Sequence, residues 1–476
     1  MNRYLTTTLP YVNADPHIGF ALEVVQADAL ARSWRLRGDD VFYFLGTDEH
    51  GQKILQAAEK AGQKVKEYVD HYSEEVRKLE AALNLKLDGH MRTSDPAHYI
   101  AAQEMWRRCE AAGDIYKKTY SGLYCVGCEA YKTQKELDEH GNCILHPSTK
   151  IEEISEENYF FRYGKYQDAL LAYLASDECI IPDWRREEAR NFVAAGLEDF
   201  SISREKKRLS WGVPVPGDDT QVMYVWFDAL TSYISVLGWP EDRDGMFHKY
   251  WNEGKVVQMA GKDQVRFQSL MWQAMLMSAG VKRSDQVFYH GFINSGGQRM
   301  SKSLGNVISP YDLVKKYGTD ATRYMLLRHV HPVEDSDVTW ERLDEWYTAN
   351  LVNGLGNLVA RVMKLAEDNL PAPVARPEAA AFPPELFETL DRYEFQSTMD
   401  YVWERIQTAD ARITAEEPYK LVKSEPEKGR AIIAELATEV YWIGRFLNPF
   451  MPNTSEAVKA AVLANKKPEN LFPRLS

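Results

Sequence analysis

Three cysteines and one histidine stand in two close pairs, Cys125 with Cys128 and Cys143 with His146, and two residues separate the members of each pair. Thiols and imidazoles at this spacing are typical of tetrahedral Zn²⁺ sites. Because four protein ligands close the coordination sphere, we predict one structural zinc ion that stabilises a small polar insertion. A redox-active cysteine pair is the alternative. It is disfavoured because Cys143 and His146 complete a zinc set, and a reducing compartment needs no disulfide there.

A second group of residues, Pro16-His17-Ile18-Gly19-Phe20, lies where a predicted strand meets a predicted helix. The first N–H groups of a helix point out of its end and favour an anion, so this junction suits a phosphate. Gly19 would let a nucleotide approach the backbone closely, and His17 could donate a hydrogen bond to a phosphoryl oxygen. Taken alone, however, the segment also fits an ordinary helix start with a solvated histidine.

A third group, residues 296–306, has the sequence GGQRMSKSLGN. It places two cations, Arg299 and Lys302, and two hydroxyls between glycines, which suits a mobile clamp on phosphates. The sequence contains no G-x-x-x-x-G-K-[ST] pattern, so the loop is not a P-loop. By itself the loop could equally be a solvated basic turn.

Together, the segments around His17 and Lys302 resemble the two signatures of class I aminoacyl-tRNA synthetases, H-I-G-H and K-M-S-K-S, in the family's order. A closer resemblance, to the methionyl-tRNA synthetase family in its short form without a C-terminal dimerisation domain, covers essentially the whole chain. It is carried by residues 8–13 (TLPYVN), 46–51 (GTDEHG), 211–216 (WGVPVP), 224–229 (YVWFDA) and 357–361 (NLVAR). The resemblance implies an enzyme that activates L-methionine with ATP to methionyl-adenylate and transfers the methionyl group to tRNA(Met), for translation initiation and elongation.

The resemblance also implies the residues that act on ATP. His17, Lys302 and Arg299 match the catalytic positions, and His17, Gly19, Phe20 and Lys302 match the ATP-binding positions. Phe20 stands where the family usually has His, and Arg299 stands where it usually has Lys. Mg²⁺ is expected to arrive with ATP, because it commonly binds through substrate phosphates and retained waters.

A methionine pocket is implied in the same way, with Asp48 paired to the substrate ammonium group. Aromatic side chains would form its wall, since a thioether packs favourably against aromatic rings. The implied residues are Leu9, Tyr11, Asp48, Trp226, Ala229, Tyr233, Phe267 and Gln268. Gln268 stands where the family often has His. Without the resemblance, Trp226 and Tyr233 would be assigned to the hydrophobic core.

The helical C-terminal part is implied to read the anticodon. Asn357 and Arg361 would contact base edges, and Tyr419, where the family usually has Trp, would stack on a base, as is common in recognition of RNA loops. The alternative to stacking is that Tyr419 is simply an amphipathic residue at the start of a helix, after Pro418. No dimerisation domain follows Phe472, so a monomer is expected.

The elements that must position these residues begin with a β-α-β-α pattern. A β-branched run at 5–9 precedes a helical pattern at 18–37, an apolar run at 41–45 predicts a buried strand, and residues 63–85 are amphipathic. This order predicts a parallel sheet. Helix–sheet alternation returns at 222–226 and 256–259. From about Trp340 the pattern is helical, with an exposed loop at 370–384.

We therefore predict an α/β fold with a split Rossmann-like nucleotide-binding domain, a zinc-knuckle insertion and a C-terminal helical bundle. The predicted parts are 1–114 (catalytic domain, first half), 115–223 (connective insertion), 224–340 (catalytic domain, second half) and 341–476 (anticodon-binding domain). Cys109 and Cys179 lie outside the zinc set and are expected to be small buried hydrophobic residues.

Composition sets the broad class. The chain has 476 residues, of which 45% are hydrophobic and 27% charged, and this excludes peptide hormones, disordered chains and small disulfide scaffolds. The formal charge of −13 argues against a polyanion partner only weakly, because a basic strip can coexist with an acidic remainder. No signal peptide and no long apolar stretch is evident, so a cytoplasmic protein without membrane contact is expected.

Two other functions are compatible with parts of the pattern. A class I synthetase for valine, isoleucine or leucine would need a larger insertion for its editing domain, and one for cysteine would need a metal in its pocket, where no cysteine is found. A zinc-knuckle tRNA-binding protein without activity is disfavoured because His17, Asp48 and Lys302 are all present.

Overall fold

A computed structural model describes residues 1–128, 130–146, 149–300, 305–377 and 382–475. The chain forms two compact units, each assembled from separate stretches of sequence. Unit 1 contains residues 1–16, 39–78 and 87–290, and unit 2 contains residues 17–38, 79–86 and 291–476. The four predicted parts divide the chain differently, and their boundaries stay a prediction.

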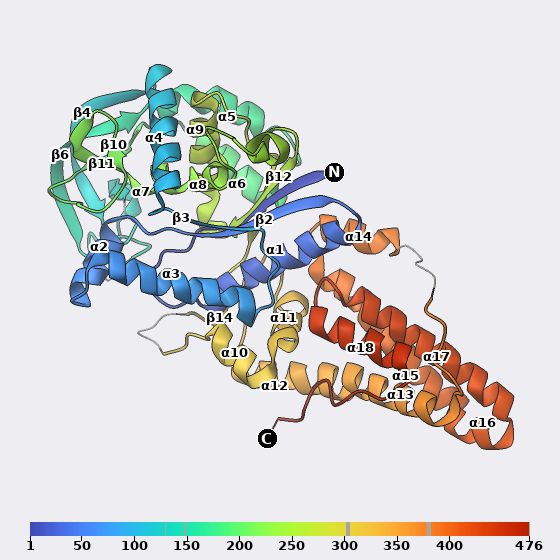
Figure 1. Cartoon of the computed structure of the whole chain (residues 1–476). Coiled ribbons are helices and arrows are strands. Elements are labelled where there is room, and N and C mark those ends of the chain that lie inside the picture. Colours follow the sequence, from blue (N-terminus) through green and yellow to red (C-terminus); the bar gives the residue numbers. More distant parts are fainter. Residues whose placement is uncertain (129, 147–148, 301–304, 378–381, 476) are drawn as a thin grey trace. The chain divides into compact units, whose positions relative to one another are not determined.

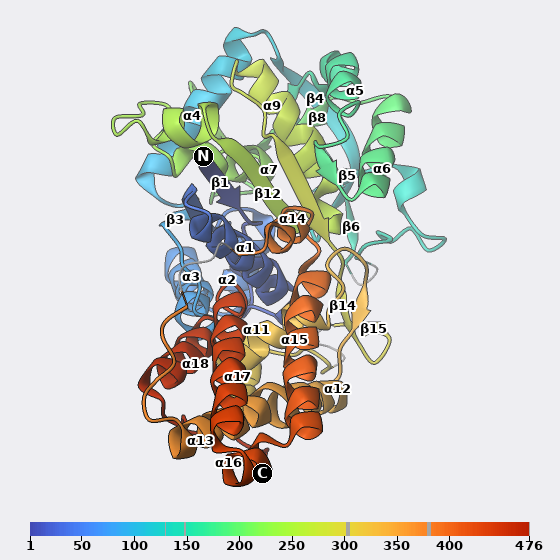
Figure 2. The ribbon, with the colours of Figure 1, turned by 90° about the vertical axis from the view of Figure 1, so that its right-hand side faces the viewer.

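Within its described residues, unit 1 is built on a parallel sheet of six strands in the order β3-β2-β1-β12-β13-β7. The strands are β1 (Asn2–Thr6), β2 (Asp40–Thr47), β3 (Gly89–Arg92), β7 (Ile180–Ile181), β12 (Lys255–Gly261) and β13 (Gln286–His290). Figures 1 and 2 show β1 beside β12, which is far away in sequence. The predicted parallel sheet is confirmed, including the strands at 41–45 and 256–259.

Helix α4 (Pro96–Ala111) of unit 1 buries one stripe of residues. Pro96 occupies the first helical turn, where proline is well tolerated, and buried residues recur at helical spacing from His98 to Cys109. The other helical segments are α2 (Gln52–Lys60), α3 (Val65–Ala82, whose end from Leu79 belongs to unit 2), η2 (Tyr163–Tyr166), α5 (Gln167–Tyr173), α6 (Asp183–Ala194), α7 (Val225–Ala229), α8 (Ser232–Ser235), η3 (His248–Asn252), η4 (Lys262–Gln264), η5 (Val265–Met271) and α9 (Trp272–Ser278). Cys109 and Cys179 are buried in the core of this unit, as expected.

The segment 115–223 forms mainly antiparallel structure. A long ribbon of β4 (Ile115–Cys125) and β6 (Ile151–Phe161) is extended by β5 (Ala130–Lys132) and β8 (Phe200–Ser201), and η1 (Gln134–Glu136) follows β5. A second small sheet contains β9 (Ser203–Glu205), β10 (Pro214–Val215) and β11 (Asp218–Met223). The same segment supplies β7 to the parallel sheet.

The expected return to helix–sheet alternation at 222–226 is confirmed only in part. Val222 and Met223 end strand β11, which is antiparallel to β10 and β9, and Val225 and Trp226 already lie in helix α7. The turn between β10 and β11 contains Gly217 at φ +77°, a backbone conformation that favours glycine, and it folds the strand back on its neighbour.

Unit 2 joins one early helix, α1 (Ile18–Leu36), to the C-terminal helices. Arg323 is fully buried; it is ion-paired with Asp28 of α1 at 2.7 Å and donates to the carbonyls of Leu83, Pro449 and Phe450. The other helices are α10 (Pro310–Tyr317), α11 (Thr319–Arg328), α12 (Trp340–Trp346), η7 (Tyr347–Gly356), α13 (Asn357–Asn369), α14 (Pro384–Asp391), α15 (Phe395–Glu416), α16 (Pro418–Ser424), α17 (Pro426–Phe446) and α18 (Pro452–Ala464). The predicted C-terminal bundle is confirmed.

A short sheet of β14 (Ile293–Ser295), β15 (Gln298–Arg299) and β16 (Ser336–Asp337) completes unit 2. In the described ranges of either unit, no helix combines the length and the apolar character that a bilayer crossing requires.

Candidate active site and metal centre

A small cavity lies in unit 1 where β1 and β2 end. Its lining residues come from the segments after these strands and from α7, α8, the turn between them, η4 and η5: Thr8, Leu9, Asp48, Trp226, Ala229, Leu230, Tyr233, Gln264 and Gln268. The carboxyl ends of parallel strands are the usual place for a ligand in such a fold. The cavity measures about 10 Å³, roughly the space of one water molecule.

Aromatic rings close this cavity. The rings of Trp226 and Phe267 are stacked, with 4.0 Å between centroids and 12° between planes, and the ring of Tyr11 meets Trp226 edge-on at 6.2 Å. Phe267 and Gln268 lie on η5, a π-helical segment, a rare geometry that is frequent at functional sites. The eight residues predicted for a methionine pocket are therefore brought together, and their roles stay a prediction.

Asp48 is buried, and its backbone is held on both sides. Its N–H donates to the carbonyl of Pro10 at 3.0 Å, its own carbonyl accepts from the N–H of Val12 at 3.2 Å, and its carboxylate accepts from the N–H of His50 at 3.3 Å. A buried carboxylate at the edge of a cavity can form an ion pair with a cationic ligand.

The residue after Asp48 fixes the same loop from the other side. Glu49 is buried, accepts two hydrogen bonds from the guanidinium of Arg92 at 2.6 and 2.9 Å, and donates its backbone N–H to Thr93. Bidentate pairs of this kind are strong and geometrically specific. The loop that carries Asp48 is therefore rigidly placed.

A buried carboxylate, Asp228, lies between two histidines. His50 Nδ1 is 3.1 Å from Asp228 Oδ2, and His98 Nε2 is 3.2 Å from Asp228 Oδ1. Burial acts to raise the pKa of Asp228, but the charge and hydrogen bonds of the two imidazoles outweigh it, so this pKa lies below its usual value. An ionised carboxylate only accepts hydrogen bonds, so both ring nitrogens must donate to it.

The sequence predicts no role for Glu49, His50, His98 or Asp228. Three of them lie in the segments 46–51 and 224–229 that carry the family resemblance. The sequence does contain a signal for Asp228. It is a carboxylate in the otherwise apolar run Val225–Ala229, and a carboxylate that is buried needs a buried partner.

His17 is the N-cap of α1, in unit 2. Its Nδ1 accepts hydrogen bonds from the N–H groups of Gly19 at 3.1 Å and Phe20 at 3.4 Å, and the N–H of Ile18 donates to the carbonyl of Ile308 at 3.1 Å. The expectation that this helix start presents these N–H groups to a phosphate is therefore wrong for this structure. Because Nδ1 accepts, a neutral ring carries its proton on Nε2, which suits a donor to a phosphoryl oxygen.

In the structure, Gly19 and Phe20 each have a packing role that does not involve a nucleotide. A Cβ on Gly19 would lie 3.0 Å from both Nδ1 and Cε1 of His17, so glycine makes room for the folded-back imidazole. The ring of Phe20 is buried. The assignment of both residues to ATP stays a prediction.

The basic loop begins as a hairpin. Gly296 and Gly297, at φ +63° and +73°, form the two-residue turn between β14 and β15, a geometry that glycine favours. Arg299 is exposed and lies 4.9 Å from the ring centroid of Phe292. Lys302 lies outside the described residues.

The predicted metal ligands converge. The ligand atoms of Cys125, Cys128, Cys143 and His146 all lie within 4.8 Å of one another, and the Cys128 sulfur is 3.1 Å from Nδ1 of His146. Burial raises the pKa of the Cys125 thiol. Three thiols and one imidazole in this arrangement could hold a metal ion, and the donor set fits tetrahedral coordination.

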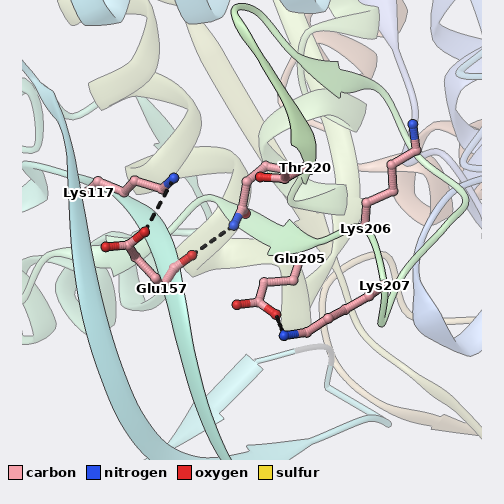
Figure 3. A pocket seen from close by; sticks show the side chains of 7 residues that line it. Lys117, Glu157, Glu205, Lys206, Lys207 and Thr220 are labelled. Atoms are coloured by element: carbon pink, nitrogen blue, oxygen red, sulfur yellow. Dashed lines mark hydrogen bonds and ion pairs between the residues drawn. The ribbon is translucent and has the colours of Figure 1, made fainter.

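A larger cleft of about 550 Å³ lies beside β4, β6, β9 and β11 (Figure 3). Its lining is polar, and its charges are largely paired with one another. Lys117 is ion-paired with Glu157 and Asp218, and Lys207 with Glu205. Of the two clefts, only the small cavity contains a buried carboxylate beside aromatic rings.

Comparison with known proteins identifies the family. The model of class I tRNA synthetases (M) matches residues 3–150 and 140–363. A methionine–tRNA ligase of Thermotoga maritima is 38% identical, covering 98% of this chain and 76% of the relative, and one of Brucella suis is 37% identical, covering 98% and 92%. A structure of Mycobacterium tuberculosis methionyl-tRNA synthetase in complex with methionyl-adenylate has a TM-score of 0.90 at 34% identity, covering 99% of this chain and 98% of that one.

The chain belongs to the methionine–tRNA ligases, a family of class I tRNA synthetases. The resemblance inferred from the signature segments is thereby confirmed.

The residues predicted to contact the anticodon in this ligase family lie on helices of unit 2. Asn357 is exposed at the start of α13, and Arg361, one turn later, is paired with Asp410 of α15 at 2.5 Å. Tyr419, on α16, is 43% exposed, its hydroxyl donates to Glu417, and the ammonium of Lys420 lies 5.9 Å from its ring centroid. Their contacts with RNA stay a prediction.

Proposed function

We propose that this chain activates L-methionine and attaches it to tRNA(Met). A carboxylate oxygen of methionine attacks the α-phosphorus of ATP. The bond between the α-phosphorus and the oxygen that bridges it to the β-phosphorus breaks, and methionyl-adenylate and pyrophosphate form. The terminal ribose hydroxyl of the tRNA then attacks the methionyl carbonyl and releases AMP. The observation that carries the proposal is the buried carboxylate of Asp48 beside the stacked rings of Trp226 and Phe267.

Asp48 would bind the ammonium group of methionine, and the aromatic rings would contact the thioether. Each sulfur–aromatic contact contributes roughly 0.3–1.5 kcal/mol. Since a methionine side chain is far larger than a cavity of about 10 Å³, side chains of the lining must move when it binds. Part of the binding energy is then spent on this rearrangement.

The first step needs no general base, because a carboxylate is already a nucleophile. The protein must align the reactants and stabilise the charge on the phosphoryl oxygens. We assign these tasks to the Nε2–H of His17 and to the cations of Arg299 and Lys302. Mg²⁺ would bind through the phosphates of ATP.

Zn²⁺ would be held by Cys125, Cys128, Cys143 and His146 as a structural ion. The four ligands leave no open coordination position for a substrate. The ion would fix the end of the β4–β6 ribbon, since Cys125 is the last residue of β4.

The direct test is ATP–pyrophosphate exchange, measured with each amino acid separately. Only methionine should support exchange. Exchange with another aliphatic amino acid at a comparable kcat/KM would contradict the assigned substrate, and no exchange with any amino acid would favour a tRNA-binding protein without activity. A monomeric state and a cytoplasmic location stay predictions.

A further inference from the structure

We propose that Asp228 is a positioning residue that sets the geometry of the methionine pocket. The inference rests on the proposed function, and it concerns a side chain that does not line the cavity. Asp228 is fully buried, and the two groups that face its carboxylate in the structure are the imidazoles of His50 and His98.

A closed circuit of contacts around the pocket includes Asp228. The N–H of His50 donates to the carboxylate of Asp48, and the ring of His50 binds Asp228. Asp228 lies two residues after Trp226 on α7, and the ring of Trp226 meets that of Tyr11. Tyr11 in turn pairs with Asp48 through an isolated parallel β-bridge. The circuit fixes the position of the proposed ammonium partner relative to the aromatic wall.

The other histidine connects Asp228 to helix α8, which also lines the pocket. His98, on α4, binds Asp228 through Nε2, and its Nδ1 is 3.1 Å from Oγ of Ser235. Ser235 ends α8, which also carries Tyr233, a residue that lines the cavity. One carboxylate therefore connects three elements that each contribute a pocket residue: the loop of Asp48, helix α7 and helix α8.

The chemistry requires an ionised carboxylate at this point. Each ring N–H donates to one of its oxygens, and hydrogen bonds to charged groups are stronger than neutral ones. Asp228→Asn keeps nearly the same shape but presents an N–H group to one of the histidines, so that bond persists only if the ring changes its tautomer and accepts. The charge that strengthens both bonds is lost in either case, so the wall connected through that histidine is held less firmly.

Unit 1 offers a matched control in a second fully buried carboxylate. Asp114 accepts hydrogen bonds from Lys165, Tyr166 and Ser278, and none of these partners lies on α7, α8 or the Asp48 loop. Asp114→Asn therefore removes a comparable charge from the same unit without touching the circuit.

A second control compares two substitutions of the same residue, His50. In His50→Asn the amide takes approximately the place of Nδ1 and can still donate to Asp228. In His50→Gln the amide takes approximately the place of Nε2, which is 3.1 Å from the hydroxyl of Tyr99, and the bond to Asp228 is lost.

The experiment is steady-state ATP–pyrophosphate exchange on the full chain, with KM for methionine, KM for ATP and kcat determined separately, alongside a thermal melt. Asp228→Asn and His50→Gln should raise KM for methionine about tenfold and leave KM for ATP within about twofold. His50→Asn should raise it less than His50→Gln, and Asp114→Asn should lower the melting temperature without changing KM for methionine.

The inference is overturned if Asp228→Asn changes KM for methionine no more than Asp114→Asn does, or if it raises both KM values equally. If Asp228→Asn does not fold, the two His50 variants decide, and equal KM values for methionine in them overturn the inference. A parent protein without methionine-dependent exchange would instead overturn the proposed function, and this inference with it.

Discussion

The backbone N–H of Ile18 donates a hydrogen bond to the carbonyl oxygen of Ile308, with 3.1 Å between the two atoms. Ile18 follows His17 at the start of α1, and Ile308 follows the loop that contains Arg299 and Lys302. The bond therefore connects, within unit 2, the two segments that we propose to act on the phosphates of ATP. Their separation depends in part on this single main-chain contact.

Ile18→Pro tests that contact, because proline removes the N–H but is tolerated in the first turn of a helix. The extended backbone of His17, at φ −113° and ψ 167°, also suits a residue before proline. We expect kcat for methionine-dependent exchange to fall about tenfold through misplaced phosphate contacts, with KM for methionine unchanged. Ile18→Val keeps the N–H and also loses buried apolar volume. Equal exchange rates in the two variants would contradict the role of this bond.

His17 combines two functions that a pair of variants can separate. Asparagine is a good N-cap and can accept from the N–H groups at the start of α1, but it lacks the Nε2–H donor. His17→Asn should lower kcat of exchange about 100-fold with little effect on the melting temperature. His17→Ala should lose the donor and also about 1 kcal/mol of stability through the missing cap. If His17→Asn keeps the parental kcat, Nε2 does not contact the reacting phosphate.

The metal site is tested by elemental analysis of the purified chain. We expect one zinc ion per chain, and its loss in Cys125→Ser. Cys179→Ser is the control, because Cys179 is equally buried but lies outside the cluster. Since the ion is proposed to hold the insertion, its removal should impair tRNA charging more than pyrophosphate exchange. A protein that is folded and active with no bound zinc would exclude the structural role.

Features that depend on local sequence were predictable. Helix 18–36 and the strands around 41–45 and 256–259 follow from the spacing of apolar residues, and the metal cluster follows from two short pairs whose members are held close by the chain. The pocket residues were assigned through the family resemblance, which supplied the three-dimensional grouping that periodicity lacks.

Features that depend on contacts between distant segments were not predictable. The grouping of α1 with the C-terminal helices includes the buried pair of Asp28 and Arg323, which no local pattern indicates. The link from His50 to Asp228 likewise joins residues far apart in sequence. The capping of α1 by the ring of His17 depends on the rotamer of this side chain. The sequence does not indicate that rotamer, so it predicts a helix start whose N–H groups point outward.

The anticodon assignment separates recognition from chemistry, and this gives the last prediction. If the assignment holds, Asn357→Ala, Arg361→Ala and Tyr419→Ala would each remove base-edge hydrogen bonds or a stacking face, and stacking contributes on the order of 1–3 kcal/mol per base. Aminoacylation should therefore fall roughly five- to hundred-fold, while pyrophosphate exchange stays unchanged because it does not involve tRNA. Arg412→Ala is a matched control, since Arg412 is about as exposed as Arg361 and is also paired with carboxylates of the bundle. Arg412→Ala should keep both pyrophosphate exchange and aminoacylation. If the variants at 357, 361 and 419 instead lose exchange and charging in parallel, together with melting temperature, these residues stabilise the bundle and do not read the anticodon.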